Sequence, residues 1–190
     1  YFAKANSSFP FSSGIVLSTG FARNAGNNFI GNVLSDDLNT GGDADLAGVL
    51  NMPTNFLRNA SFIEFDFIPI TNQITFNYIL ASEEYSDGYE CEFTDAFALL
   101  LRRVGTTTYT NLAVLPNNGG VVSTSNIHPA VNGSNGVCAA VNEQYFGGYN
   151  TTNSDTNFQG RTIPLTATAT VIPGETYHFK MVIADFSDHQ

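Results

Sequence analysis

Residues 61–69 read Ser-Phe-Ile-Glu-Phe-Asp-Phe-Ile-Pro, and this alternation decides the fold class of the chain. Successive side chains of a β-strand point to opposite faces of the sheet. Ile63, Phe65 and Phe67 therefore share an all-apolar face, whereas the opposite face mixes Phe62 and Ile68 with the two acidic residues. This pattern predicts a half-buried strand of an antiparallel sheet.

Residues 73–81 repeat the alternation, and residues 69–72 supply a turn, so we expect these two strands to pair antiparallel. Pro173 and Gly174 predict a second turn, because proline presets φ and glycine accepts positive φ. One short helical turn is expected within residues 43–59. Further strands are expected at 14–20, 96–102, 112–115, 162–171 and 176–184.

Many strands, scarce helical periodicity and a long Asn/Gly-rich loop at residues 117–160 predict an all-β fold. We expect an antiparallel β-sandwich, jelly-roll-like, with little helix. Its length of 190 residues fits a single domain spanning residues 1–190. Both ends look cut, so we expect a fragment of a longer multi-domain protein, with the first and last strands outside this range.

Composition narrows the classes of partner. The chain has 17 acidic and 7 basic residues and a formal net charge of −10, which argues against nucleic acid and anionic membranes. No run of eighteen apolar residues is present, so no direct membrane insertion is expected. The low charge content and the richness in Asn, Thr and Ser are typical of a secreted β-protein.

Two cysteines, Cys91 and Cys138, are an even number in a chain of extracellular character. A disulfide between them is the favoured interpretation, with two separate buried thiols as the alternative. Their spacing fits neither a zinc site nor a redox dithiol.

Three short blocks, residues 40–46, 81–87 and 90–97, hold about half of the acidic residues. Carboxylates at this density repel one another unless a cation relieves the repulsion, and Ca²⁺ takes six to eight oxygen ligands. The alternatives are solvated turn residues, Asp43 acting only as a helix cap, and catalytic carboxylates. The predicted calcium ligands are Asp43, Asp45, Glu83, Glu84, Asp95 and Asp185.

Aromatic residues Tyr145, Phe146 and Tyr149 lie within the long loop. They are weak candidates for stacking on sugar rings, and a plug over a sheet face is the favoured alternative. Nucleophile-elbow, phosphate-loop and helix-borne histidine-pair motifs are absent from the sequence, so we expect no enzyme.

Several motifs, taken in order, give the chain a family resemblance, and they are residues 13–20, 38–46, 63–69, 81–85, 91–97, 173–180 and 183–185. It resembles the choice-of-anchor L family of secreted bacterial proteins, found mostly in Bacteroidota. The resemblance implies a non-enzymatic, exported β-domain of a large surface protein, with type IX secretion in gliding members, some of which act as adhesins.

Together these observations predict a calcium-stabilised adhesion or binding module at the bacterial cell surface. Its expected partners are an extracellular polymer or surface ligand, such as a polysaccharide, and the neighbouring modules of the same polypeptide. A carbohydrate-binding module that uses the loop aromatics is the alternative. A glycosidase that uses the clustered carboxylates is the third hypothesis.

Overall fold

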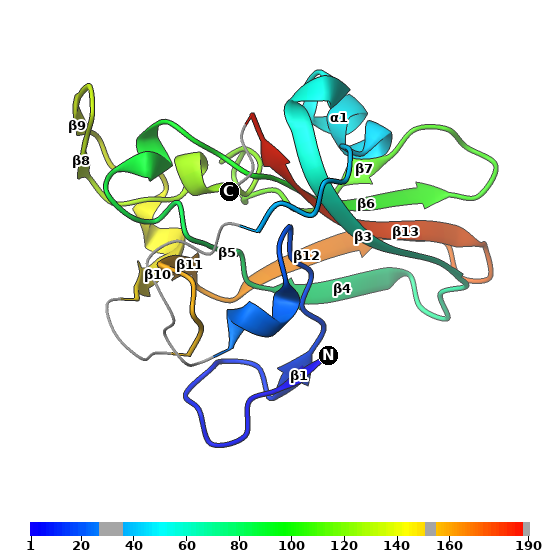
Figure 1. Ribbon diagram of the computed structural model, residues 1–190. Helices are drawn as coiled ribbons and strands as arrows, with labels where there is room; N and C mark the ends of the chain where they lie inside the picture. Colours follow the sequence, from blue (N-terminus) through cyan, green and yellow to red (C-terminus); the bar gives the residue numbers. More distant parts are fainter. Residues whose placement is uncertain (27–35, 151–154, 188–190) are drawn as a thin grey trace.

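The computed structural model describes residues 1–26, 36–150 and 155–187, and their regular structure is mostly antiparallel β-sheet (Figure 1). The main sheet has the strand order β3-β13-β6-β7, so β13 lies between β3 and β6. All three pairings in this sheet are antiparallel, which confirms the predicted fold class. The bounds are β3 (Leu57–Phe67), β13 (Tyr177–Phe186), β6 (Ala96–Arg103) and β7 (Thr110–Asn111).

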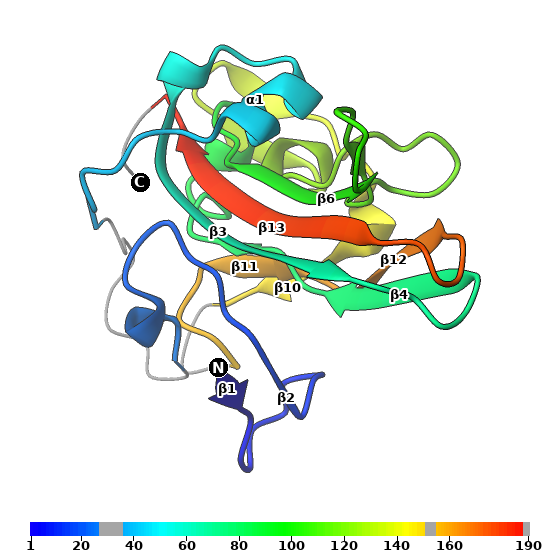
Figure 2. The same cartoon turned by 90° about the vertical axis from the view of Figure 1, so that its right-hand side faces the viewer.

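A second layer, formed by β4 (Gln73–Tyr78) and β12 (Leu165–Thr170), lies against the main sheet (Figure 2). Apolar side chains of the two layers share one core cluster, in which Phe179 of β13 is fully buried. Leu99 of β6 and Ala167 of β12 belong to the same cluster. This two-layer arrangement is sandwich-like, and the jelly-roll connectivity stays a prediction.

The expected pairing of residues 61–69 with 73–81 is wrong. The strand β3 pairs with β13, and β4 pairs with β12 in the other layer. The segment between β3 and β4 carries the chain from the main sheet to the second layer. The segment between β12 and β13 lies beside it and carries the chain back to the main sheet. Two backbone hydrogen bonds join these crossings, from Val171 to Asn72 and from Gly174 to Pro69.

The predicted helical turn is present as α1 (Ala44–Leu50), and its ends have clear causes. Asp43 caps the N-terminus by accepting a 2.9 Å hydrogen bond from the backbone amide of Leu46. Asn51 ends the helix in the left-handed conformation at φ 55°. Leu46 is fully buried in a core cluster with Leu100 and Val182 of the main sheet, so the helix covers that sheet.

Three smaller sheets complete the described regular structure. One of them has the order β10-β11-β5, and the other two are pairs of short strands. The loop predicted at residues 117–160 is therefore not structureless, because it contains β8, β9 and β10. The bounds are β1 (Phe2–Ala3), β2 (Ser13–Gly14), β5 (Ala81–Ser82), β8 (Val131–Gly133), β9 (Gly136–Cys138), β10 (Phe146–Tyr149) and β11 (Gly160–Thr162).

Short 3₁₀ turns connect several of these strands. The one that matters for the site is η3 (Tyr89–Cys91), which follows the left-handed Gly88. The other turns are η1 (Ala22–Ala25), η2 (Thr54–Phe56), η4 (Thr124–Asn126) and η5 (Glu143–Tyr145). Among the described residues, no helix combines the length and the apolar character that a membrane crossing requires.

Of the remaining predicted strands, 96–102 and 176–184 are confirmed as β6 and β13. The predicted strand at 162–171 is divided between β11 and β12. Residues 112–115 contribute only an isolated bridge between Val114 and Val121, and only the first residue of 14–20 lies in a strand.

Candidate functional site

A groove of about 610 Å³ opens between η3, the β8–β9 hairpin and β10. Its volume falls within the range of small-molecule sites, which is roughly 300–1,000 Å³. Most of its lining groups are polar. Those used below are Glu90, Val131, Asn132, Tyr149, Asn150 and Gln159.

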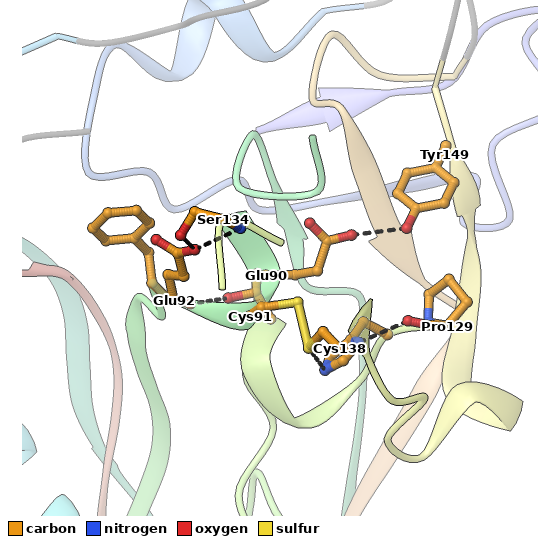
Figure 3. Close-up of a disulfide and its surroundings, with 10 residues drawn as sticks. Glu90, Cys91, Glu92, Pro129, Ser134, Cys138 and Tyr149 are labelled. Atoms are coloured by element: carbon orange, nitrogen blue, oxygen red, sulfur yellow. Dashed lines mark hydrogen bonds between the residues drawn. A yellow bond between two sulfur atoms is a disulfide. The ribbon is translucent and has the colours of Figure 1, made fainter. Parts of the chain in front are cut away.

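Glu90 is the least expected member of this groove, because its side chain is 1% exposed. Its Oε1 accepts a 2.8 Å hydrogen bond from the hydroxyl of Tyr149 (Figure 3). Its Oε2 is buried and has no hydrogen-bond partner among the described residues. A buried carboxylate oxygen without a donor is costly, so this atom favours a ligand that brings one.

Asn150 also lines the groove, and its side chain carries a second buried acceptor. Its side-chain amide donates to the carbonyl oxygen of Thr156, and its backbone amide donates to that of Gln159. Its Oδ1 is buried and has no hydrogen-bond partner in the part of the chain that the structure describes. Two residues that line one groove therefore each carry a buried acceptor without a donor among the described residues.

The three aromatic candidates take different places. Tyr149 is 43% exposed and lines the groove, with its hydroxyl held by Glu90. Phe146 packs behind it, with ring centroids 4.7 Å from Tyr149 and 5.1 Å from Tyr85. Tyr145 packs against the core cluster around Leu115 and Ile127. The plug interpretation therefore describes Phe146 and Tyr145, which are half-buried, and Tyr149 is the most exposed of the three.

Two tyrosines of the groove keep their protons to high pH. Burial, followed by the charges of Glu90 and Glu84, raises the pKa of Tyr85 above its ordinary value. Burial and the hydrogen bond to Glu90 also raise the pKa of Tyr149. Both hydroxyls are therefore donors at neutral pH, and Tyr85 donates at 2.9 Å to the carbonyl oxygen of Ile127.

The disulfide predicted between Cys91 and Cys138 is present, and it ties η3 to the β8–β9 hairpin (Figure 3). Ser134, at the turn of that hairpin, donates two hydrogen bonds to the carboxylate of Glu92, one from its hydroxyl and one from its backbone amide. The hydrogen bond from the backbone amide is 3.0 Å long. These contacts hold the hairpin that forms one wall of the groove, because Val131 and Asn132 of β8 line it.

The six predicted calcium ligands fall into three separate places. In the first, Asp43 and Asp45 both bind the ammonium group of Lys180, at 2.6 and 2.8 Å. Lys180 lies on β13, and only 5% of its side chain is exposed. The helix-cap alternative for Asp43 is thus realised, and this pair already has a cation.

In the second place, Glu84 accepts a 2.6 Å hydrogen bond from the hydroxyl of Thr124. It also accepts a 3.3 Å bond from the backbone amide of Asp95. The Glu84 carboxylate therefore fixes the start of β6 against η4, which is a structural arrangement.

In the third place, Glu83 and Asp185 line a small, partly open cavity of about 20 Å³ with Asp36. Asp185 is 1% exposed and accepts a 2.8 Å hydrogen bond from the side chain of Asn59. Asp36 accepts a 3.0 Å bond from the side chain of Asn24. The cavity volume suits one water molecule or one ion.

The carboxylates of this third place do not converge on a single point. Among the described residues, no three carboxylates bring an oxygen each within 4.8 Å of one another; the set of three ligand-type residues that does so is Cys91, His128 and Cys138. The sequence could indicate Glu83 and Asp185, but it gave no sign of Asp36. Nor did any pattern mark Glu90 and Asn150 as buried acceptors of one groove.

These features define a class of protein, a disulfide-bonded antiparallel β-module with a polar surface groove. The chain belongs to the choice-of-anchor L domain family, because the model of that family matches residues 1–190, its whole length. Membership places the chain among modules of cell-surface or secreted proteins. No curated protein and no solved structure matches the chain.

Proposed function

We propose that this chain is a non-enzymatic adhesion module that binds an extracellular polysaccharide through the groove beside Tyr149. The observation that carries the proposal is the buried Oε2 of Glu90, a residue that lines the groove, because this atom has no donor among the described residues. Sugar hydroxyls supply donors of the required kind, and they also satisfy Oδ1 of Asn150. A satisfied buried acceptor recovers the free energy that its desolvation costs.

The exposed ring of Tyr149 supports the same ligand class. Its hydroxyl is fixed on Glu90, so the ring is held in one orientation before a ligand arrives. A rigid aromatic surface next to buried acceptors suits a sugar, which has an apolar face and hydroxyl edges. The net charge of −10 favours neutral over strongly anionic polymers.

Calcium is the second part of the proposal, and the cavity lined by Asp36, Glu83 and Asp185 is where we place it. The three carboxylates come from segments far apart in the sequence, so an ion there would join the end of β13, the turn after β5 and the N-terminal region. Oxygen ligands of this kind suit Ca²⁺. We also propose export by type IX secretion, as in Bacteroidota that glide, which loss of surface display in a secretion-deficient host would test.

Glycan binding is tested on a polysaccharide array, followed by calorimetry with the best oligosaccharide. We expect Glu90→Gln and Tyr149→Ala each to weaken binding by about tenfold or more, since each is worth at least about 1.4 kcal/mol. Tyr149→Phe keeps the aromatic ring, so it should weaken binding less than Tyr149→Ala does. Glu143→Gln and Tyr1→Ala, at exposed positions outside the groove, are the matched controls. Equal binding by Glu90→Gln, Tyr149→Ala and their controls would exclude this groove.

The calcium part has its own readout. A ligand that binds only the folded state raises stability by mass action, so a chelator should lower the melting temperature and added Ca²⁺ should restore it. Asp36→Asn and Glu83→Gln should shrink that response, whereas Glu143→Gln should keep it. An unchanged melting curve in chelator would remove calcium from the proposal. If the wild type releases reducing sugar ends, and Glu83→Gln loses this activity at unchanged stability, the protein is a glycosidase instead.

A further inference from the structure

His128 is a fully buried histidine next to the disulfide, and its surroundings fix which ring nitrogen carries the proton. Its Nδ1 lies 2.8 Å from the carbonyl oxygen of Pro129. A carbonyl oxygen only accepts, so Nδ1 carries a hydrogen, and in the neutral ring Nε2 then keeps its lone pair. The side chain is 1% exposed, and water therefore does not reach this lone pair freely.

Nε2 of His128 faces Cys138 Sγ at 3.9 Å. A disulfide sulfur has no proton to donate, so this contact gives the buried lone pair no hydrogen. The same lone pair would be satisfied if the sulfur were a thiol or if both atoms bound a metal ion. A buried histidine with Nδ1 on a backbone carbonyl and Nε2 aimed at a sulfur has the orientation of a metal ligand.

We propose that Cys91, His128 and Cys138 form a zinc site when the disulfide is reduced. The ligand atoms of all three residues lie within 4.8 Å of one another. With Zn–S near 2.3 Å and Zn–N near 2.0 Å, ligand atoms of a tetrahedral site lie about 3.5–3.8 Å apart. Opening of the sulfur–sulfur bond is thus the main movement that the site requires, and the three residues leave a fourth coordination position unassigned.

The spacing of the two cysteines in the sequence does not indicate such a site, because the third ligand comes from a separate loop. His128 is held there by an antiparallel bridge to Val141, with backbone hydrogen bonds of 2.9 Å in both directions. Cys138 is partly exposed, and it ends a hairpin whose Val137 is 78% exposed, so reductant and ion have access from solvent.

The chemistry balances as two steps. An external dithiol reductant gives two electrons and two protons to the disulfide, becomes a disulfide itself and leaves two thiols. Zn²⁺ then binds both sulfurs as thiolates and Nε2 as neutral imidazole, and the two thiol protons pass to solvent. Either state ties η3 to the β8–β9 hairpin, so the wall of the groove is held whether the protein is oxidised or reduced.

The test uses the whole chain, reduced anaerobically with a phosphine, which is oxidised to its phosphine oxide with oxygen from water. Dialysis against Zn²⁺ should give one bound ion per reduced chain and none per oxidised chain. Co²⁺ in place of zinc should give the visible bands of a tetrahedral site and a near-ultraviolet thiolate band. Addition of millimolar Ca²⁺ should leave these bands unchanged, which separates the site from the proposed calcium cavity.

Variants assign the ligands. His128→Gln should weaken zinc binding about tenfold or more, and Cys91→Ser should remove the thiolate band in part. His178→Gln is the matched control, because His178 binds Asp66 on the main sheet instead. A second measurement uses the reduced wild type, so it does not depend on whether the variants fold. Zinc should slow the reaction of both thiols with a disulfide dye.

Three results would overturn the proposal. They are the absence of zinc binding by the reduced wild type, an octahedral cobalt spectrum without a thiolate band, and equal affinity in a folded His128→Gln variant. If reduction unfolds the chain, zinc must restore the fold, since a site built from the native loops stabilises them by mass action. A reduced chain that stays unfolded in zinc would therefore also refute the site.

Discussion

The ring of Phe76 stacks on the ring of Phe179, with centroids 4.2 Å apart and ring planes inclined by 8°. Phe76 belongs to β4 and Phe179 to β13, so this contact joins the two layers of the sandwich. Phe179 is fully buried. The pair therefore explains why β4 faces the main sheet and does not pair with β3 at its edge.

Substitution of Phe179 should be among the most destabilising changes in the chain. We expect Phe179→Ala to lower the free energy of unfolding by about 3–5 kcal/mol, through lost apolar burial and the cavity left behind. Urea denaturation measures this. A double-mutant cycle with Phe76→Ala should give a coupling of roughly 0.5–1.5 kcal/mol. Ile70→Ala, at a side chain 93% exposed, is the control; additive losses from Phe76 and Phe179 would contradict the stacking role.

Lys180 should matter more than an ordinary surface lysine. Its substitution by methionine leaves the carboxylate of Asp43, 9% exposed, without its cation. Loss of one partner of a buried pair costs about 3 kcal/mol or more. Asp45 is 41% exposed, and Asp45→Asn should cost less than about 1 kcal/mol. Denaturation curves that rank the two variants in the opposite order would show that Asp45 is the principal partner.

Stability should fall at alkaline pH. Burial raises the pKa of Tyr78 to about 12. Burial lowers the pKa of Lys180, but the hydrogen bonds and charges of Asp43 and Asp45 outweigh it and raise the pKa overall. Unfolded tyrosine and lysine titrate near 10–10.5, so above that range the folded chain holds more protons than the unfolded chain.

The contribution of these groups is fully present below about pH 9.5 and is lost as pH rises through 10 toward 12. Melting temperatures measured between pH 8 and 11.5 should show this decline. Tyr78→Phe should flatten part of it, since phenylalanine does not titrate. The same slope in wild type and Tyr78→Phe would assign the alkaline loss to other groups.

Loss of the disulfide should destabilise the oxidised chain. Cys91 and Cys138 are 47 residues apart, and closing a loop of that length lowers the entropy of the unfolded state by an amount worth about 4 kcal/mol at 25 °C. The double variant Cys91→Ser with Cys138→Ser should therefore melt well below the oxidised wild type. Equal melting temperatures would show that the crosslink contributes nothing.

Part of this structure could be predicted from local patterns. The alternation around Phe65 and the apolar run after Ala96 identify strands, because the period of two is a local property. The spacing of Leu46, Val49 and Leu50 likewise predicts α1. Strand partners could not be predicted in this way. The crossing after β3 resembles a hairpin turn, and only its contact with the crossing near Gly174 shows that two segments change layers together.

The candidate site shows the same limit. The acidic blocks indicate a need for counterions, but the cation for Asp43 is Lys180, which lies 137 residues further along the chain. Burial of Glu90 depends on the hydroxyl of Tyr149, 59 residues away. Long-range neighbours of this kind leave no periodic signal in the sequence.

The position of β13 has a consequence for how the molecule forms. This strand pairs with β3 on one side and β6 on the other, yet it is the last strand in the described chain. The strands β3 and β6 consequently cannot be joined in one sheet until residues 177–186 are available. Formation of the main sheet therefore depends on contacts between residues far apart in the sequence, which slows folding. If such a chain left a cell with its N-terminus first, the main sheet would stay unformed during export and would form only after β13 had emerged.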